Sequence, residues 1–313
     1  MLSVTLLAAV IPSGYVLTVG DLMGEWRGNN EWGLHNGASH LYSAQRPLLD
    51  AFVHGGGLWC EHTMGMHDTP NNFFACAAGA LPLTVNGHTI TLTRQPQDDP
   101  WLVGMVLRYT MVAPHYVDLD VSLTPTDAAK FAPSGVAVFM SASYMATTLD
   151  PAINFRGLTG PNQPETWIRA DATQPDKLGH LYDTGGGIYT HLDAFPLPVV
   201  KGNQAYFNLN SFPWPRFTQP FYFGRTQGMV WELMFDRGWT PVDEIRFPLF
   251  EFPIKGTTPQ AYNPAWDWQY VIHNVVAGQT YRYCGRAIWK PFVSQEDAQA
   301  EYDNWRAVTP QCS

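Results

Sequence analysis

The sequence predicts an all-β fold, a large antiparallel β-sandwich with a short C-terminal helix. Segments in which apolar and polar residues alternate recur along the 313-residue chain, as expected of strands with one buried face. Gly- and Pro-rich connections separate them, for example 157–164 and 212–220. The composition shows no break and no repeat, so we expect one domain over 1–313. A cupin-like or jelly-roll barrel is the alternative fold.

Several strands follow from local patterns. Residues 83–92 predict a hairpin, because Asn86-Gly87 can supply the positive φ angles of a tight turn. In the strand expected at 116–123, Val117, Leu119, Val121 and Leu123 point one way and Asp118, Asp120 and Ser122 the other. The same pattern predicts strands at 101–111, 135–144, 204–209, 227–235, 268–276 and 280–289.

The two ends of the chain differ. The apolar run 2–11 is far shorter than the ~20 residues that span a bilayer, and Val4–Leu7 suit a first strand. Residues 294–308 predict a helix. Ser294 is a suitable N-cap, and Ala298, Tyr302 and Trp305 share one face. We expect this helix to pack across the sheets, and we expect no membrane association.

Charge and aromatic content narrow the partners. The net charge of −9 argues against nucleic acid, whose phosphates require basic patches. Twelve Trp and fourteen Tyr are more than a core needs and suit the faces of sugar rings, although a β-rich core also favours aromatics. Cys60 and Cys76 can form a disulfide, or they can remain free thiols. We expect a secreted or periplasmic protein and leave the oligomeric state open.

Residues 54–68 predict the site of chemistry. This segment holds three histidines, two carboxylates and an indole beside a glycine triplet, in a chain poor in charge. Histidine exchanges protons near neutral pH and binds metals. We therefore expect Glu61, His62 and His67 to act in acid–base catalysis, and His54 and Trp59 to bind substrate.

A metal site is the alternative use of the same segment. His54, His62, His67 and Asp68 offer ligands for Zn, Fe or Mn, and Glu61 can replace Asp68. The spacing matches neither H-E-x-x-H nor a compact cupin motif. His35 and His40 either join such a site or bond loop carbonyls. The leading expectation is that no cofactor is needed.

A second cluster lies at 225–237. Glu232 lies in an apolar strand, where its pKa is expected to be raised as in a general acid; pairing with an arginine of a neighbouring strand is the alternative. Trp231 could stack on a sugar, and Arg225 could orient it. Asp236 and Arg237 are expected to form a turn ion pair, and a catalytic role is the alternative.

Two single residues complete the candidates for substrate binding. Arg156 could clamp an anion or a hydroxyl, or anchor its loop. Tyr144 ends the strand expected at 135–144 and could transfer protons through its phenol, or simply pack in the core.

One strand carries a family resemblance. Residues 206–209, Tyr-Phe-Asn-Leu, resemble the aldose epimerase strand His-x-Tyr-Phe-Asn-Leu, with Gln204 where the epimerase has its histidine. The chain thus resembles galactose-mutarotase-like carbohydrate-active proteins, which implies a supersandwich fold and a sugar ligand. Because that histidine is the epimerase acid, the resemblance implies no catalytic residue here.

These observations lead to three hypotheses of function. The first is a carbohydrate-active enzyme, a glycoside hydrolase or polysaccharide lyase that cleaves a glycosidic bond by His/Glu acid–base chemistry. The second is a non-catalytic saccharide-binding protein, in which aromatics supply the affinity. The third is a metal-dependent oxidase or isomerase on a cupin-like barrel.

Overall fold

A computed structural model describes residues 14–28, 36–53, 56–65, 73–76, 81–171, 186–196 and 214–308. Within these ranges the chain forms three open sheets, and every strand pair in them is antiparallel. Neither large sheet closes on itself. The β-sandwich prediction is therefore confirmed, and the barrel alternative is wrong.

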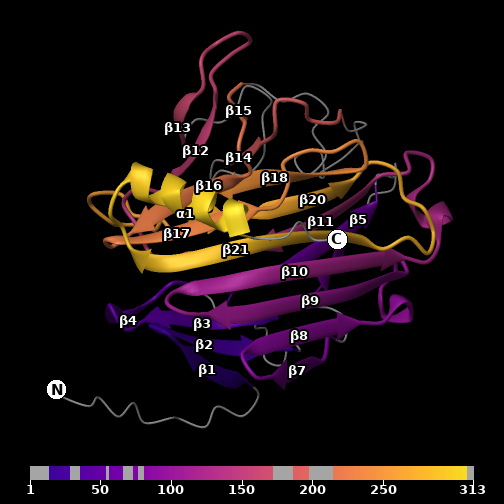
Figure 1. Cartoon of the computed structure of the whole chain (residues 1–313), viewed down its shortest axis with the longest axis horizontal. Helices are drawn as coiled ribbons and strands as arrows, with labels where there is room; N and C mark the ends of the chain where they lie inside the picture. The colour runs from indigo at the N-terminus through magenta and orange to yellow at the C-terminus, as the bar shows by residue number, and fades with distance from the viewer. Residues whose placement is uncertain are drawn as a thin grey trace.

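The largest sheet forms one layer of the sandwich (Figure 1). Its order is β13-β12-β16-β17-β21-β10-β9-β8-β7, with β15 paired to β12. The strands that the structure describes in it are β7 (Leu83–Asn86), β8 (Thr89–Arg94), β9 (Val103–Val112), β10 (Tyr116–Pro125), β12 (Ile153–Leu158), β13 (Thr166–Ala170), β15 (Arg216–Phe217), β16 (Phe221–Thr226), β17 (Met229–Phe235) and β21 (Tyr281–Pro291).

Two smaller sheets pack against the largest one. The first has the order β14-β18-β20-β11-β5-β6, with β19 paired to β18, and we call it the site sheet. Its described strands are β5 (Trp59–Gly65), β6 (Phe73–Ala75), β11 (Ala137–Ala142), β14 (Gly186–Tyr189), β18 (Asp243–Phe250), β19 (Ala265–Trp266) and β20 (Trp268–Ile272). The second contains β1 (Tyr15–Val19), β2 (Leu22–Arg27), β3 (Gly37–Ser43) and β4 (Arg46–Asp50).

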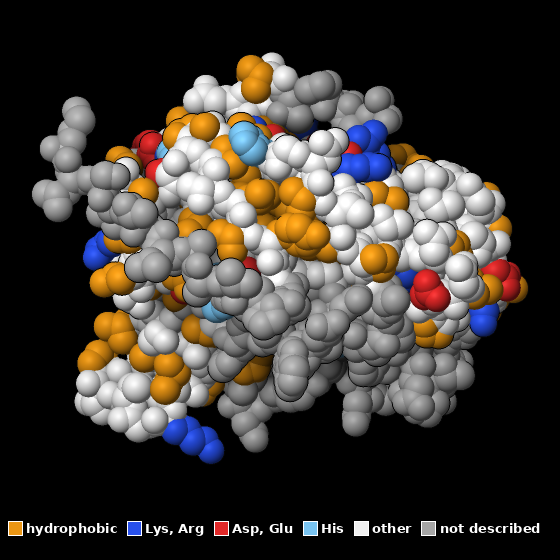
Figure 2. All heavy atoms as spheres, turned by 90° about the horizontal axis from the view of Figure 1, so that it is seen from below, with side chains coloured by type: hydrophobic (Ala, Val, Ile, Leu, Met, Phe, Trp, Pro, Cys, Tyr) orange, Lys and Arg blue, Asp and Glu red, His pale blue; other side chains and the backbone are white. Residues whose placement is uncertain are grey.

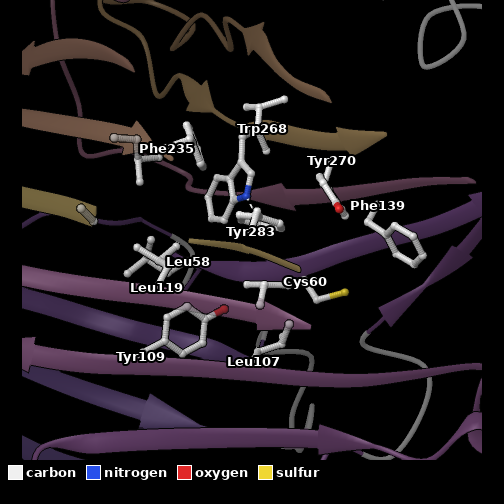
Figure 3. Close-up of a cluster of buried hydrophobic side chains, with 14 of the residues drawn as sticks. Leu58, Cys60, Leu107, Tyr109, Leu119, Phe139, Phe235, Trp268, Tyr270 and Tyr283 are labelled. Atoms are coloured by element: carbon white, nitrogen blue, oxygen red, sulfur yellow. Dashed lines mark hydrogen bonds between the residues drawn. The ribbon is translucent and has the colours of Figure 1, made fainter. Parts of the chain in front are cut away.

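One apolar core joins all three sheets. Figure 3 shows Tyr109 and Leu119 of the largest sheet facing Trp268 and Tyr270 of the site sheet. Trp268 Nε1 donates a hydrogen bond to the Tyr283 hydroxyl at 2.7 Å, so a polar atom in this core is satisfied.

The four-stranded sheet reaches the same core through Trp26. Its ring stacks on Tyr109 at 5.2 Å. A backbone bridge between Ala38 and Gly57 connects this sheet to the segment before β5. The two smaller sheets together therefore cover the largest one.

Most predicted elements are confirmed. β7 and β8 form the expected hairpin, with Gly87 at φ +58°, and Val117, Leu119, Val121 and Leu123 are buried. The predicted strands at Val4–Leu7 and 204–209 lie outside the described residues. So does the epimerase-like motif.

The C-terminal helix α1 (Gln295–Val308) also follows the prediction. Ser294 Oγ accepts a hydrogen bond from the Asp297 amide at 3.2 Å, and Ala298, Tyr302 and Trp305 are buried. The helix lies across β17 and β21 on the outer face of the largest sheet (Figure 1). Two 3₁₀ turns, η2 (Pro96–Asp98) and η3 (Ala128–Phe131), complete the helical segments among the described residues.

The surface agrees with the low charge content. On the face shown in Figure 2, the described Lys and Arg side chains stand apart and hydrophobic side chains lie between them. Among the residues that the structure describes, no helix has the length and apolar character needed to cross a membrane.

Candidate active site on the site sheet

A β-bulge in strand β5 determines where Glu61 points. Cys60 pairs with Ser141 and His62 with Met140, so Glu61 has no partner on β11. Cys60 and Thr63 both face inward, although they are three residues apart, because the bulge adds one residue between them. Glu61 and His62 therefore project together from the outer face of the site sheet.

A disulfide holds this strand. Cys60 and Cys76 are bonded, with their Cα atoms 5.6 Å apart and 16 residues between them in sequence. The bond joins β5 to the end of the β5–β6 hairpin. Of the two alternatives left open by the sequence, the structure shows the disulfide and not the free thiols, and the strand that carries Glu61 is fixed on its inner side.

Glu61 has two polar neighbours. The Tyr144 hydroxyl donates a hydrogen bond to Glu61 Oε1 at 3.2 Å, and His62 Nε2 lies 3.5 Å from the same oxygen. The Glu61 and His62 side chains are 13% and 16% exposed, so a ligand can reach them. A carboxylate, an imidazole and a phenol thus meet at one carboxylate oxygen, as proton transfer to or from a ligand requires.

A second carboxyl, Asp267, lies behind them. Strand alternation places Asp267 and Gln269 on the outer face, because Trp266, Trp268 and Tyr270 belong to the core. Asp267 is buried, and its Oδ1 accepts a hydrogen bond from the Ser143 amide at 3.1 Å. Burial, together with the negative charge of Glu61, raises the pKa of Asp267 well above its ordinary value. Burial therefore favours the protonated form of Asp267 over the charged one.

Aromatic rings line one side of this cluster. The Tyr144 ring lies 5.9 Å from Trp59 and 6.2 Å from Phe252. Trp59 is only 4% exposed, whereas Phe252 is 36% exposed. Tyr144 and Phe252 therefore offer accessible ring surface, and Trp59 supports Tyr144 from below rather than stacking on a ligand as predicted.

The other charged groups on this face anchor a loop. Glu244 and Arg246 are ion-paired and buried, and both bond the backbone of Phe195. His273 stacks on the Phe195 ring at 4.4 Å. Glu244, Arg246 and His273 therefore anchor Phe195 and are not part of the candidate active site.

Glu232 does not lie at this site. It shares the outer face of the largest sheet with Val230 and Met234, beneath α1, while Trp231 and Leu233 face the core. The core of the sandwich therefore separates Glu232 from Glu61. The predicted pairing of Glu232 with Glu61 and His62 is wrong, because the two carboxyls lie on opposite outer faces.

The environment of Glu232 is unusual. Its side chain is fully buried, and neither oxygen has a hydrogen-bond partner among the described residues. The alternative of a neighbouring-strand arginine as partner is therefore also wrong. Burial, with the nearby charges of Glu301 and Asp297, raises the pKa of Glu232 well above its usual range, against the opposing effect of Lys290. The expected rise in the pKa of Glu232 is present, but its full burial keeps any substrate away from the carboxyl.

The other described candidates for substrate binding, Trp231, Arg156 and Arg225, belong to the largest sheet and not to the site sheet. Trp231 is fully buried with its ring edge-on to Phe52, so it cannot stack on a sugar as predicted. Arg156 and Arg225 are on β12 and β16 of the largest sheet, paired with Glu165 and Asp150 at 2.7 Å each. Arg237 pairs with Asp236 at 2.8 Å, as expected of a turn ion pair.

The metal alternative involves residues outside the described ranges. His35, His54, His67 and Asp68 all lie there. Among the described residues no group of three or more His, Cys, Asp or Glu side chains could hold a metal ion. His40 is described, and its Nδ1 bonds Asp50 on β4 rather than a loop carbonyl.

Sequence analysis missed Asp267 and Phe252. A signal for Asp267 was present, since Asp267 and Gln269 alternate with Trp266, Trp268 and Tyr270. Such a pattern predicts polar groups on the face opposite an aromatic core. Phe252 follows a strand end and carried no comparable signal.

Comparison of the sequence with known proteins found no matching family model and no matching curated relative. The fold, however, is known. A galactose mutarotase related enzyme from Lactobacillus acidophilus superposes with a TM-score of 0.50 at 8% identity, over 88% of this chain and 97% of that one.

Two further solved structures match with lower TM-scores. A GalM/aldose epimerase homologue from C. elegans gives a TM-score of 0.46 at 9% identity, over 90% of this chain and 99% of that one. Heparan sulfate lyase HepC from Pedobacter heparinus gives 0.42 at 8% identity, over 87% of this chain and 33% of that one. The predicted resemblance to galactose-mutarotase-like β-sandwich proteins is confirmed at the level of fold.

Proposed function

We propose that this protein is a carbohydrate-active enzyme that cleaves a glycosidic bond by acid–base chemistry at Glu61. The observation that carries the proposal is the meeting of Glu61, His62 and Tyr144 at one carboxylate oxygen, beside the ring surface of Tyr144 and Phe252. The galactose-mutarotase-like fold supports a saccharide as the ligand.

Each group has a defined role in this scheme. Glu61 takes a proton, either from water in hydrolysis or from the carbon next to a uronate carboxylate in elimination. Tyr144 gives its proton to the leaving glycosidic oxygen as the C–O bond breaks, and recovers it afterwards through Glu61. His62 can exchange the proton that Glu61 holds. Asp267 is buried, so it acts as a positioning residue that affects the substrate only through Glu61.

Product analysis tests the proposal. Purified protein is incubated with neutral and uronate-containing polysaccharides, and reducing ends and absorbance at 235 nm are recorded. New reducing ends alone mean hydrolysis, and additional 235 nm absorbance means elimination. Turnover that is equal in wild type and Glu61→Gln would overturn the proposal. Saccharide binding without any turnover would establish a binding protein instead.

The proposal requires no metal. Elemental analysis of wild type beside a His62→Ala, His67→Ala double variant checks this. Stoichiometric metal that is lost in the double variant would replace acid–base chemistry with metal-dependent chemistry.

We also propose secretion or a periplasmic location. The disulfide between Cys60 and Cys76 supports this, because such bonds persist in oxidising compartments. Cell fractionation of the native host tests it, and a wholly cytosolic protein would contradict it.

A further inference from the structure

A pocket separate from Glu61 lies at the turn between β16 and β17. Its volume is about 520 Å³, within the range of roughly 300–1,000 Å³ typical of small-molecule sites. Leu149, Asp150, Arg225, Gln227 and Phe292 contribute to its lining.

Arg225 presents a pre-oriented cation to this pocket. Its Nη2 donates to Asp150 at 2.7 Å, and its guanidinium lies over the Phe292 ring at 5.1 Å. The Arg225 side chain is 45% exposed, and its Nε and Nη1 groups make no hydrogen bond to the residues that the structure describes. A guanidinium held on two sides with donors to spare suits an oxyanion.

The charge around the pocket also favours an anion. Asp150 is shared between Arg225 and Arg169, each at 2.7 Å, and Arg169 also pairs with Asp171 at 2.8 Å, so Arg225 has Asp150 as its one carboxylate partner, which it shares. Across the turn, Arg46 donates to the Gln227 carbonyl at 3.1 Å. Two arginines therefore pair with the one carboxylate in the pocket's lining, and a third arginine lies across the turn.

The rest of the lining suits a sugar ring. Leu149 is 63% exposed and forms an apolar wall with Phe292. The turn is rigid, because Gln227 and Gly228 both have positive φ angles and the Gln227 side chain donates to the Thr147 carbonyl at 3.2 Å. The side-chain oxygen of Gln227 can accept a hydrogen bond from a sugar hydroxyl.

One segment connects the pocket to the candidate active site. Residues 144–150 carry Tyr144 at one end and Asp150 at the other, and a six-residue step spans at most about 20 Å. Arg225 is paired with Val230 and so lies on the outer face of the largest sheet, whereas Glu61 lies on the outer face of the site sheet. That the ligand is a saccharide rests on the proposed function.

We propose that this pocket binds the carboxylate of a uronate residue in an acidic saccharide, with Arg225 as the group that holds the carboxylate. The protein is thus directed toward acidic rather than neutral saccharides.

Calorimetric titration of the Glu61→Gln variant with D-glucuronate, D-glucose and acetate tests this. We expect glucuronate to bind at least tenfold more tightly than glucose or acetate, and Arg225→Gln to weaken it at least tenfold. Arg108→Gln is the matched control, since Arg108 is 44% exposed and also paired with an aspartate, and it should bind glucuronate normally.

Three results would overturn the inference. Equal binding of acetate and glucuronate would mean a simple anion site. If glucose bound as tightly as glucuronate, the carboxylate would have no role in recognition. Unchanged binding in Arg225→Gln would exclude this pocket. Because the readout is binding in a Glu61 variant, it stands apart from the test of turnover.

Discussion

Glu61 and Glu232 are both carboxylates on β-strands, yet their surroundings differ completely. Glu61 bonds the phenol of Tyr144, lies 3.5 Å from His62 and remains 13% exposed. Glu232 is fully buried under α1, and no residue in the described part of the chain hydrogen-bonds its carboxyl. A raised pKa is therefore not sufficient to indicate catalysis, because reach to a ligand is also required.

The largest expected effect is a difference in turnover between variants of the two carboxyls. Glu61→Gln should lower turnover by about 10²–10⁴, the usual contribution of a general base. Glu232→Gln should leave turnover unchanged, since the core lies between it and the site. Initial rates on the best polysaccharide check this. Equal losses in both variants would mean that the distinction drawn between the two groups is wrong.

The next largest effect is expected on removal of the disulfide, which stabilises the side of the sandwich that carries Glu61. Replacing Cys60 and Cys76 by Ser should lower the free energy of unfolding by about 3 kcal/mol, as expected for a loop of this length. Urea unfolding measures it. The near-UV signal from the packing of Trp305, a buried residue of α1, should be retained below the transition. An unchanged midpoint would contradict the prediction.

Glu232 should show its effect in stability. Replacing it by Leu removes an unpaired buried carboxyl and should stabilise the protein by about 1–3 kcal/mol at neutral pH. The pKa of Glu232 in the folded protein lies above the ordinary 4.5. The free energy of unfolding of the wild type therefore falls as pH rises from about 4.5 toward that folded pKa. Urea midpoints from pH 4 to 8 should therefore diverge between the two proteins, and parallel curves would contradict this.

The smallest effect concerns a pair remote from Glu232, His40 and Asp50. The hydrogen bond to Asp50 raises the pKa of His40 above 6.5, although partial burial opposes it. The pair's stabilisation is complete below pH 6.5 and is lost as pH rises through the folded pKa. His40→Gln should cost less than about 1 kcal/mol, because the side chain is partly exposed. NMR titration of His40 checks the direction, and a lowered pKa would contradict it.

Local sequence was sufficient for much of the strand structure. The alternation in 116–123 and the Asn86-Gly87 turn predicted β10 and the β7–β8 hairpin because burial of one face and turn geometry are local requirements. It also selected Glu61, His62 and Tyr144, which the structure brings together. It could not exclude Trp231 or Glu232, whose exposure depends on which face α1 covers.

The sequence by itself determined the all-β class, the C-terminal helix and the segment that contains Glu61, since these follow from periodicity, capping and composition. Only the tertiary structure decided that a bulge turns Glu61 outward, that Asp267 lies behind it, and that Glu232 is on the far side of the core. Strand pairing and layer order join residues distant in sequence, and no local pattern records which faces will meet.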